Sequence, residues 1–332
     1  MIYSTLTALS CLFFTTTDLN AIDVQDLIKP GLQFAYVEAF DSAKSYFDKV
    51  ISLHPENPAG YFFKAALLQV KMLDECQFSD EKEYLVLIKQ VSKKSEEILE
   101  KEDNLWATFY LGSSYTYRAV FEGLKSNYFE AFRYGVSGGK ILQSVIKKDS
   151  TFYDAYLGSG SYEYFWARAA RYLPVLKLMG GDVNEAIRKL HVAAEKSLYS
   201  GPTAMNSLVF IYGEEGQCDR ATNIIDSLLI EYPHSRTFLW NKANLEFKKK
   251  NYRLAADLYN KIFAVYDSLG EKNYANLAQC QLFIGNCFYE LKEKEKAKEA
   301  LKEVIGFKKY ADQYPQIKKY CRAAYGLLGR LL

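Results

Sequence analysis

The feature that most constrains this chain is an internal repeat of roughly 35 residues. In each copy an alanine is followed by an apolar or aromatic residue four positions later, and by another apolar residue after three more. Steps of four and three place these side chains on one face of an α-helix. The five copies are Ala43-Phe47-Val50, Ala186-Leu190-Ala193, Ala221-Ile225-Leu228, Ala255-Tyr259-Ile262 and Ala297-Leu301-Val304. Such a repeat predicts stacked units, because one unit cannot bury its apolar face alone.

A second pattern marks another helix in each unit. The stretches "YLGSSYTY" (110–117), "YLGSGSY" (156–162) and "LFIGNCFY" (282–289) place a small residue one turn from an aromatic one. A small residue at this place allows a neighbouring helix to approach closely. Each unit is therefore predicted to be a pair of packed helices, an A-helix followed by a B-helix.

Together these patterns resemble the tetratricopeptide repeat family, a helix-turn-helix with W-x2-L-G-x2-Y, then A-x3-F, then P. The resemblance covers roughly residues 24–310, is strongest over 182–305, and is looser over 66–150, where longer helices are expected. It implies an all-α fold, a right-handed superhelix (α-solenoid) of six or seven helix pairs closed by a helix at about 316–331. The matching residues are Leu111-Gly112, Leu157-Gly158 and Ile284-Gly285 for L-G, Tyr115 and Phe288 for the aromatic, and Pro55 and Pro233 for the proline.

The stretch "GEEGQCDRA" (213–221) looks at first like a small chemical site. Gly216 lies five residues before Ala221, where the resemblance places the turn between the A- and B-helices, and Gly181 precedes Ala186 by the same step. Glycine tolerates the left-handed backbone that such a helix end requires. Asp219 is expected in the first turn of the B-helix, and Cys218 is expected to pack as a small apolar residue.

Composition excludes several classes of protein. With 49% hydrophobic and 25% charged residues the chain is globular, and seven prolines and nineteen glycines provide few turns for an all-β fold. A formal charge of +2 does not indicate a nucleic-acid-binding surface. Six cysteines without a CxxC pair, and three histidines without an H-x-x-x-H pair, indicate no metal site. We therefore expect no metal and no cofactor.

One stretch of the sequence matches a catalytic motif. "GVSGG" (135–139) matches G-x-S-x-G, in which a strand-to-helix turn exposes a nucleophilic serine. The preceding "NYFEAFRY" is typical of a helix, and Gly138 stands where the repeat has its alanine. Ser137 is therefore not predicted to be a nucleophile, and the protein is not predicted to be an enzyme.

The resemblance places a ligand-binding groove on the concave face of the superhelix. In this family, A-helix residues pointing away from the B-helix line that face, and Asn and aromatic residues there hold an extended peptide. Asparagine suits this role because its amide offers both a donor and an acceptor. The alternative for any one of these residues is an ordinary solvent-facing position. The matching residues are Asn206, Phe210, Trp240, Asn241, Asn244, Gln279, Leu282, Phe283 and Asn286.

The segment 163–181, "EYFWARAARYLPVLKLMGG", departs from the repeat by inserting about a helix's worth of residues. One interpretation is a lengthened helix packed into the array, since aromatic residues at helical spacing are usually core. The other is a lid over the groove, or a contact for a partner or membrane surface, carried by Trp166, Arg168, Arg171 and Tyr172.

The N-terminus divides the chain into two predicted parts. Residues 1–21 contain an apolar run from Leu6 to Phe14 followed by small polar residues and Ala21, a pattern typical of a secretory signal. The alternative is a disordered cytoplasmic tail or a first helix. The remainder, 22–332, is expected to form one solenoid. The chain is accordingly expected to be exported, periplasmic or envelope-associated, with membrane association only through the N-terminus or 163–181.

Two functions follow from these predictions. The first is a non-catalytic scaffold that binds a protein or peptide partner in the concave groove. The alternative is an exported accessory protein that binds a small apolar ligand or lipid in a cavity closed by 163–181. A deep apolar cavity beneath Phe165–Leu176 would favour the alternative.

Overall fold

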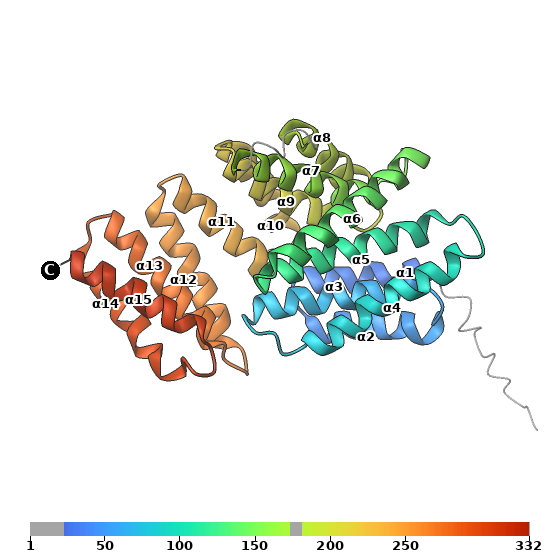
Figure 1. Ribbon diagram of the computed structural model, residues 1–332. Coiled ribbons are helices and arrows are strands. Elements are labelled where there is room, and N and C mark those ends of the chain that lie inside the picture. Colours follow the sequence, from blue (N-terminus) through green and yellow to red (C-terminus); the bar gives the residue numbers. More distant parts are fainter. Residues whose placement is uncertain (1–22, 173–180, 332) are drawn as a thin grey trace, which may run out of the picture.

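The computed structural model describes residues 23–172 and 181–331, except for the side chain of Tyr172 (Figure 1). Within these ranges the chain is all-α, as predicted. The helices are α1 (Val24–Tyr36), α2 (Phe40–Leu53), α3 (Pro58–Asp74), α4 (Glu81–Leu99), α5 (Leu105–Leu124), α6 (Tyr128–Lys148), α7 (Ala155–Tyr172), α8 (Val183–Lys196), α9 (Gly201–Glu214), α10 (Cys218–Glu231), α11 (Arg236–Lys248), α12 (Tyr252–Ser268), α13 (Tyr274–Glu290), α14 (Lys294–Gly306), the short 3-10 helix η3 (Phe307–Tyr310) and α15 (Gln316–Arg330).

Within residues 23–172 and 181–331, consecutive helices form seven pairs, α1–α2 through α13–α14, and α15 closes the array on α13 and α14. Each helix packs mainly on its neighbours in sequence, and the A-helices also touch one another from α3 to α5, α7, α9 and α11. The predicted number of pairs and the closing helix are confirmed. Helices α3 to α6 have 17, 19, 20 and 21 residues, against 13 or 14 in α9 to α11. The expectation of longer helices in this region is also confirmed.

The repeat positions form the core, as the pattern predicts. Every residue of the five Ala-based copies is buried, and the most exposed of them, Phe47, is only 1% exposed. The small A-helix residues allow the close approach that was expected. A Cβ added to Gly158 would lie 2.3 Å from Leu142 Cδ1, and one added to Gly285 would lie 2.8 Å from Leu301 Cδ2. Larger residues at either glycine would push the B-helix away.

Among the described residues, each turn between an A-helix and its B-helix has one position with left-handed backbone. Two of these are Gly181, with φ 103°, and Gly216, with φ 75°, as predicted. Asp219 lies in the first turn of α10, and Cys218 packs against the core beside it. The other five turns use Glu38, Cys76, Ser126, Lys250 and Lys292.

The first helix pairs curl back toward the last ones, so that blue and orange parts of the chain lie near each other in Figure 1. At the end of α1, the Tyr36 hydroxyl contacts Thr203 Oγ1 of α9 at 3.1 Å. The Glu38 carboxylate accepts hydrogen bonds from the backbone N–H groups of Arg236 (2.8 Å) and Thr237 (2.9 Å). These N–H groups begin α11 and have no partner within their own helix. A turn from the start of the chain therefore caps a helix nearly 200 positions later.

Candidate functional site

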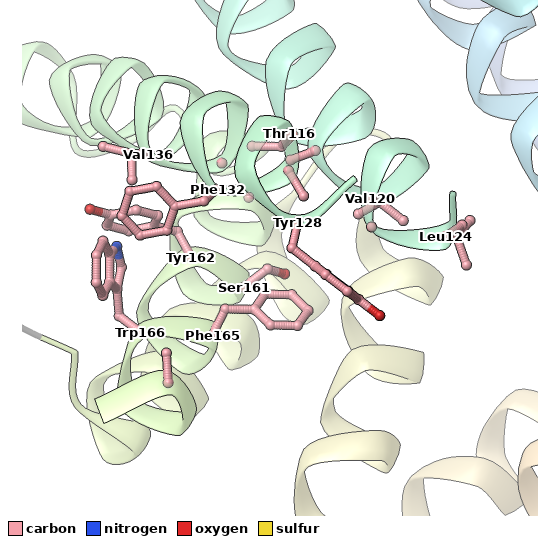
Figure 2. Close-up of a pocket in the computed structure, with 16 residues that line it drawn as sticks. Thr116, Val120, Leu124, Tyr128, Phe132, Val136, Ser161, Tyr162, Phe165 and Trp166 are labelled. Carbon is pink, nitrogen blue, oxygen red and sulfur yellow. The ribbon is translucent and has the colours of Figure 1, made fainter. Parts of the chain in front are cut away.

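An apolar hollow of about 570 Å³ lies between α5, α6 and α7. Figure 2 shows its aromatic side chains in two groups, with Phe132, Tyr162 and Trp166 at one end and Tyr128 and Phe165 at the other. Among the described residues that line it, none is charged. We call this space the apolar hollow. Its lining is suited to an apolar ligand and offers no acid or base for catalysis.

The hollow exists because α5 and α6 meet there through small side chains. A Cβ added to Gly135 of α6 would find Ala119 of α5 at 3.6 Å, and one added to Gly123 would find Ala131 at 3.9 Å. Side chains larger than those of glycine and alanine at these positions would fill the space between the helices. The helices therefore stay close at their backbones while the space toward α7 remains empty.

Aromatic residues from α6 and α7 frame the hollow. Trp166 is buried, and its ring stands edge-on to Phe132 (centroids 5.4 Å apart) and Tyr162 (6.0 Å). Tyr128, Phe165 and Phe132 are instead 73%, 62% and 50% exposed. Large aromatic side chains that gather around a hollow and remain exposed are typical of a contact surface.

A second hollow of about 370 Å³ continues inward from the first. The two share Thr116, Val120, Gly158, Ser161 and Phe165. The second is bordered by α1, α3 and α9 as well, on the inner side of the superhelix. Phe165 thus lies where the two meet.

The residues predicted to form a lid have different roles. The described part of the segment 163–181 continues α7 as far as Tyr172. Trp166 is a wall of the hollow, whereas Arg168 pairs with Glu214 of α9 at 2.8 Å and Arg171 pairs with Glu215 at 2.7 Å. The two arginines therefore join α7 to the end of α9. The Tyr172 side chain and residues 173–180 lie outside the described residues, so a lid is not tested.

The residues predicted for the concave groove bond largely to one another or to neighbouring helices. Asn241 donates to Asn206 Oδ1 at 2.6 Å, and Asn286 donates to the Leu282 carbonyl in its own helix at 2.9 Å. The Phe210 ring stands edge-on to Tyr164 of α7, with centroids 6.2 Å apart, yet the residue remains 54% exposed. The others are paired as follows: Trp240 with the Tyr266 hydroxyl, Asn244 with the Tyr259 hydroxyl, Gln279 with the Tyr320 hydroxyl, and Phe283 stacked on Tyr259.

The structure reveals a polar site that the repeat pattern did not identify. The turn after α3, residues 74–77, which we call the docking turn, lies against α11, α13 and α15. Arg236 grips the Asp74 carboxylate through two nitrogens, at 2.6 and 3.1 Å, and the Tyr266 hydroxyl donates to it at 2.7 Å. Both charged side chains are less than a tenth exposed. Burial and the neighbouring carboxylate raise the pKa of Tyr266 well above its ordinary value, so it stays a donor.

Two signals could have pointed to this site. Asn276 lies one turn before Gln279 on the same A-helix, so the repeat position that marks Gln279 as a groove residue also marks Asn276. Arg236 is a charged residue at a place where the repeat needs no charge. The docking turn itself has no signal in sequence, because its contacts depend on how far the superhelix curls.

The candidate catalytic and metal residues are not assembled into a reactive site. Ser137 lies in the middle of the continuous helix α6, without the strand-to-helix turn that its motif needs. Within the described residues, no group of three or more His, Cys, Asp or Glu side chains could hold a metal ion. Burial raises the pKa of the Cys287 thiol to about 12, which makes it a poor nucleophile.

Stacked antiparallel helix pairs, with a curved inner side and no assembled catalytic group among the described residues, define an α-solenoid repeat protein. Residues 235–309 match the family model described as "Tetratricopeptide repeat". Residues 235–309 are therefore identified as tetratricopeptide repeats, and the other described helices share their solenoid architecture.

Comparison with solved structures finds similar proteins at low identity. A chain of the APC/C hetero-tetramer Cut9-Hcn1 is 16% identical with a TM-score of 0.56, over 92% of this chain and 56% of that one. A thermophilic tetratricopeptide repeat protein from Thermus thermophilus is 15% identical with a TM-score of 0.42, over 68% and 100%. One from Parabacteroides merdae is 15% identical with a TM-score of 0.43, over 91% and 98%. No curated protein matches the sequence.

Tetratricopeptide repeat domains generally bind proteins or peptides, and proteins of this family are generally non-catalytic. None of the described helices is long and apolar enough to cross a membrane.

Proposed function

We propose that this protein is a non-catalytic scaffold whose main partner site is the apolar hollow. The observation that carries the proposal is the pairing of an uncharged hollow of about 570 Å³ with aromatic side chains that stay exposed at its edge. Covering apolar surface contributes about 25 cal/mol per Å². A partner that covers Tyr128, Phe132 and Phe165 would gain most of its affinity there, because aromatic anchors dominate interfaces.

The occupant that fits this shape is an apolar segment of a protein. The hollow lies between helices, and grooves of this kind accept side chains spaced at three and four residues along a partner helix. Phe210 on α9 is the predicted concave-face residue that keeps enough exposure to extend this contact. The remaining predicted groove residues would contribute only if their internal hydrogen bonds exchanged for bonds to the partner.

The second candidate is the binding of a small apolar ligand or lipid chain. It is favoured by the second hollow of about 370 Å³, which shares Phe165 and Val120 with the first and leads toward the inside of the superhelix. Ligand sites commonly have volumes of about 300–1,000 Å³ and a mostly apolar lining. The apolar hollow beside Phe165 supports this alternative, although residues 173–176 of the expected cavity lie outside the described residues.

A pair of measurements separates the two candidates. A photo-crosslinking amino acid replaces Phe165 in one full-length variant and Ile230, which is exposed on α10, in the control. The scaffold proposal expects a discrete protein adduct from cells at Phe165 and none at Ile230. The second candidate alone predicts that native mass spectrometry of the purified protein detects a bound small molecule. Equal labelling at both positions, with no retained ligand, excludes both.

We further propose that residues 1–21 are a secretory signal and that 22–332 functions as one solenoid outside the cytoplasm. The support is the apolar run followed by small polar residues. N-terminal sequencing of the protein from its native cells is expected to begin near Asp23. A mature chain that begins at Met1 would favour the cytoplasmic alternative.

A further inference from the structure

The docking turn is bound through its backbone carbonyls, as a peptide ligand often is. Its consecutive backbone carbonyls, those of residues 74, 75 and 76, each accept a hydrogen bond from a different amide side chain. The donors are Asn276 (2.5 Å), Asn273 and Gln316 (2.7 Å) in that order. Two of these amides lie at or just before the start of α13, and the third begins α15. Amide side chains that read consecutive carbonyls recognise a backbone, whatever its side chains.

Two side chains of the turn add specificity to this backbone contact. The Asp74 carboxylate is held by the paired nitrogens of Arg236 and by the Tyr266 hydroxyl. Cys76 packs into an apolar pocket formed mainly by α13 and α15, and its thiol contacts Asn276 Oδ1 at 3.2 Å. The docking face, which comprises Arg236, Tyr266, Asn273, Asn276 and Gln316, therefore selects an acidic residue followed two positions later by a small apolar one.

This contact differs from the helix packing that builds the rest of the superhelix. No helix among α1 to α4 packs lengthwise on α11 to α15 in the described part of the chain. The connection is made by turns and helix ends. Glu38 contacts the start of α11, the Tyr36 ring of α1 stacks on Phe238 of α11 with centroids 6.4 Å apart, and the docking turn lies beside them. Cys76 also has left-handed backbone, with φ 53°, which non-glycine residues rarely adopt. A turn attached in this way can leave its site without dismantling a helix pair.

We propose that the docking face is a peptide-binding site that the chain's own turn occupies, and that a partner segment with the same chemistry displaces it. The partner segment presents an aspartate, exposed backbone carbonyls at this and the next two residues, and a small apolar side chain at the second position after the aspartate. Its positively charged counterpart, Arg236, is already buried against a carboxylate, so an uncharged segment does not compete. Displacement frees the end of α3 from α11, α13 and α15, while the Glu38 contact with α11 remains.

The test uses a labelled peptide of residues 70–79, VKMLDECQFS, and the full chain. In wild-type protein the attached turn competes at an effective concentration of about millimolar, so weak binding is expected. In an Asp74→Ala chain the docking face is intact but its own ligand is weakened. Fluorescence anisotropy is expected to show binding roughly tenfold tighter or more than in wild type.

Matched controls decide whether the site is the one proposed. The same peptide with alanine in place of its aspartate is expected to lose binding to the Asp74→Ala chain, as is the wild-type peptide with an Asp74→Ala/Arg236→Ala chain. Cys76→Gly is the second variant, since glycine accepts the left-handed backbone and only the apolar anchor is lost; it too should bind the peptide more tightly than wild type. Equal binding to wild type and both variants overturns the proposal. A wild-type dimer that the peptide dissociates also overturns it, because the occupant is then a second copy.

Discussion

The apolar hollow and the docking face are two surfaces of one superhelix that differ in polarity and in whether the chain covers them. The hollow, between α5 and α7, is uncharged and stays open, with Phe165 exposed at its edge. The docking face, on α11 to α15, is polar and is covered by the chain itself. The difference follows from the cost of each surface. Exposed apolar side chains are tolerated, whereas buried polar and charged groups need a partner in every state.

The two regions are therefore expected to bind a partner in different ways. A ligand of the hollow covers surface that is already available, so its binding displaces no part of the chain. A ligand of the docking face must compete with a tethered turn, so its binding is coupled to the position of the end of α3. Variants that weaken one region without the other can therefore test the comparison.

The largest effect is expected at the docking turn. Asp74→Ala leaves Arg236 and Tyr266 buried without their acceptor, and removing one member of a buried pair costs about 3–5 kcal/mol. Because the turn can detach and let water reach Arg236, we expect the lower end, about 3 kcal/mol. Urea unfolding measures the loss. The matched control is Asp312→Ala, since that carboxylate is fully exposed and is expected to change stability by less than about 0.5 kcal/mol. A loss at Asp74 equal to that at Asp312 would show that the pair contributes little.

The next effect concerns the hollow and appears in binding instead of stability. Phe165→Asp places a charge at the meeting point of the two hollows and is expected to weaken partner or ligand binding by about tenfold or more, roughly 1.4 kcal/mol. Stability should change little, because the side chain is 62% exposed. Isothermal titration with the captured partner measures the change. Ile230→Asp on α10 is the control, and an equal loss of binding there would contradict a role for the hollow.

A smaller effect tests why the hollow is empty. Gly135→Ala adds a Cβ that meets only Ala119 at 3.6 Å, so removing a helix-interior glycine is expected to stabilise the protein by about 0.5–1 kcal/mol. Gly139→Ala, one turn further along α6, is the matched control. Its Cβ would lie 2.3 Å from the Tyr162 ring, and we expect a loss of about 1–3 kcal/mol. Thermal unfolding compares the two. If both substitutions destabilise equally, the space beside Gly135 is not free.

The fold was largely predictable because the repeat encodes contacts between neighbours. Ala221 and Ile225 share a helix face that only an adjacent helix can cover, so spacing alone indicates both the helix and its buried side. The turns were less predictable. Gly216 and Gly181 were identified by their residue type, but Ser126, Lys250 and Lys292 adopt the same left-handed backbone without glycine. Their conformation is imposed by the two helices that they join.

The sites were less predictable because they depend on the curvature of the superhelix and on space that small side chains leave unfilled. Trp166 and Phe165 lie in a segment that attracted notice for its aromatic residues, yet the hollow beside them arises from Gly135 and Ala119, which look like ordinary packing residues. The docking turn touches residues about 200 positions away. No local pattern carries such a contact, since small rotations between successive repeats determine whether the ends meet.

The smallest effect is a pH dependence at Glu38, the other turn that closes the array. Burial raises the pKa of this carboxyl above its ordinary value of 4.5, although the backbone N–H groups of Thr237 and Arg236 and the Arg236 charge oppose the rise. The folded state therefore holds the proton more tightly than the unfolded state. The resulting stabilisation is complete below pH 4.5 and is lost as the pH rises through the raised pKa. Urea unfolding of wild type and Glu38→Gln at several pH values isolates this contribution, because the amide cannot titrate. The stability of wild type relative to the variant is expected to fall as the pH rises through this window, whereas a difference that rises with pH would show that the N–H groups at the start of α11 outweigh burial.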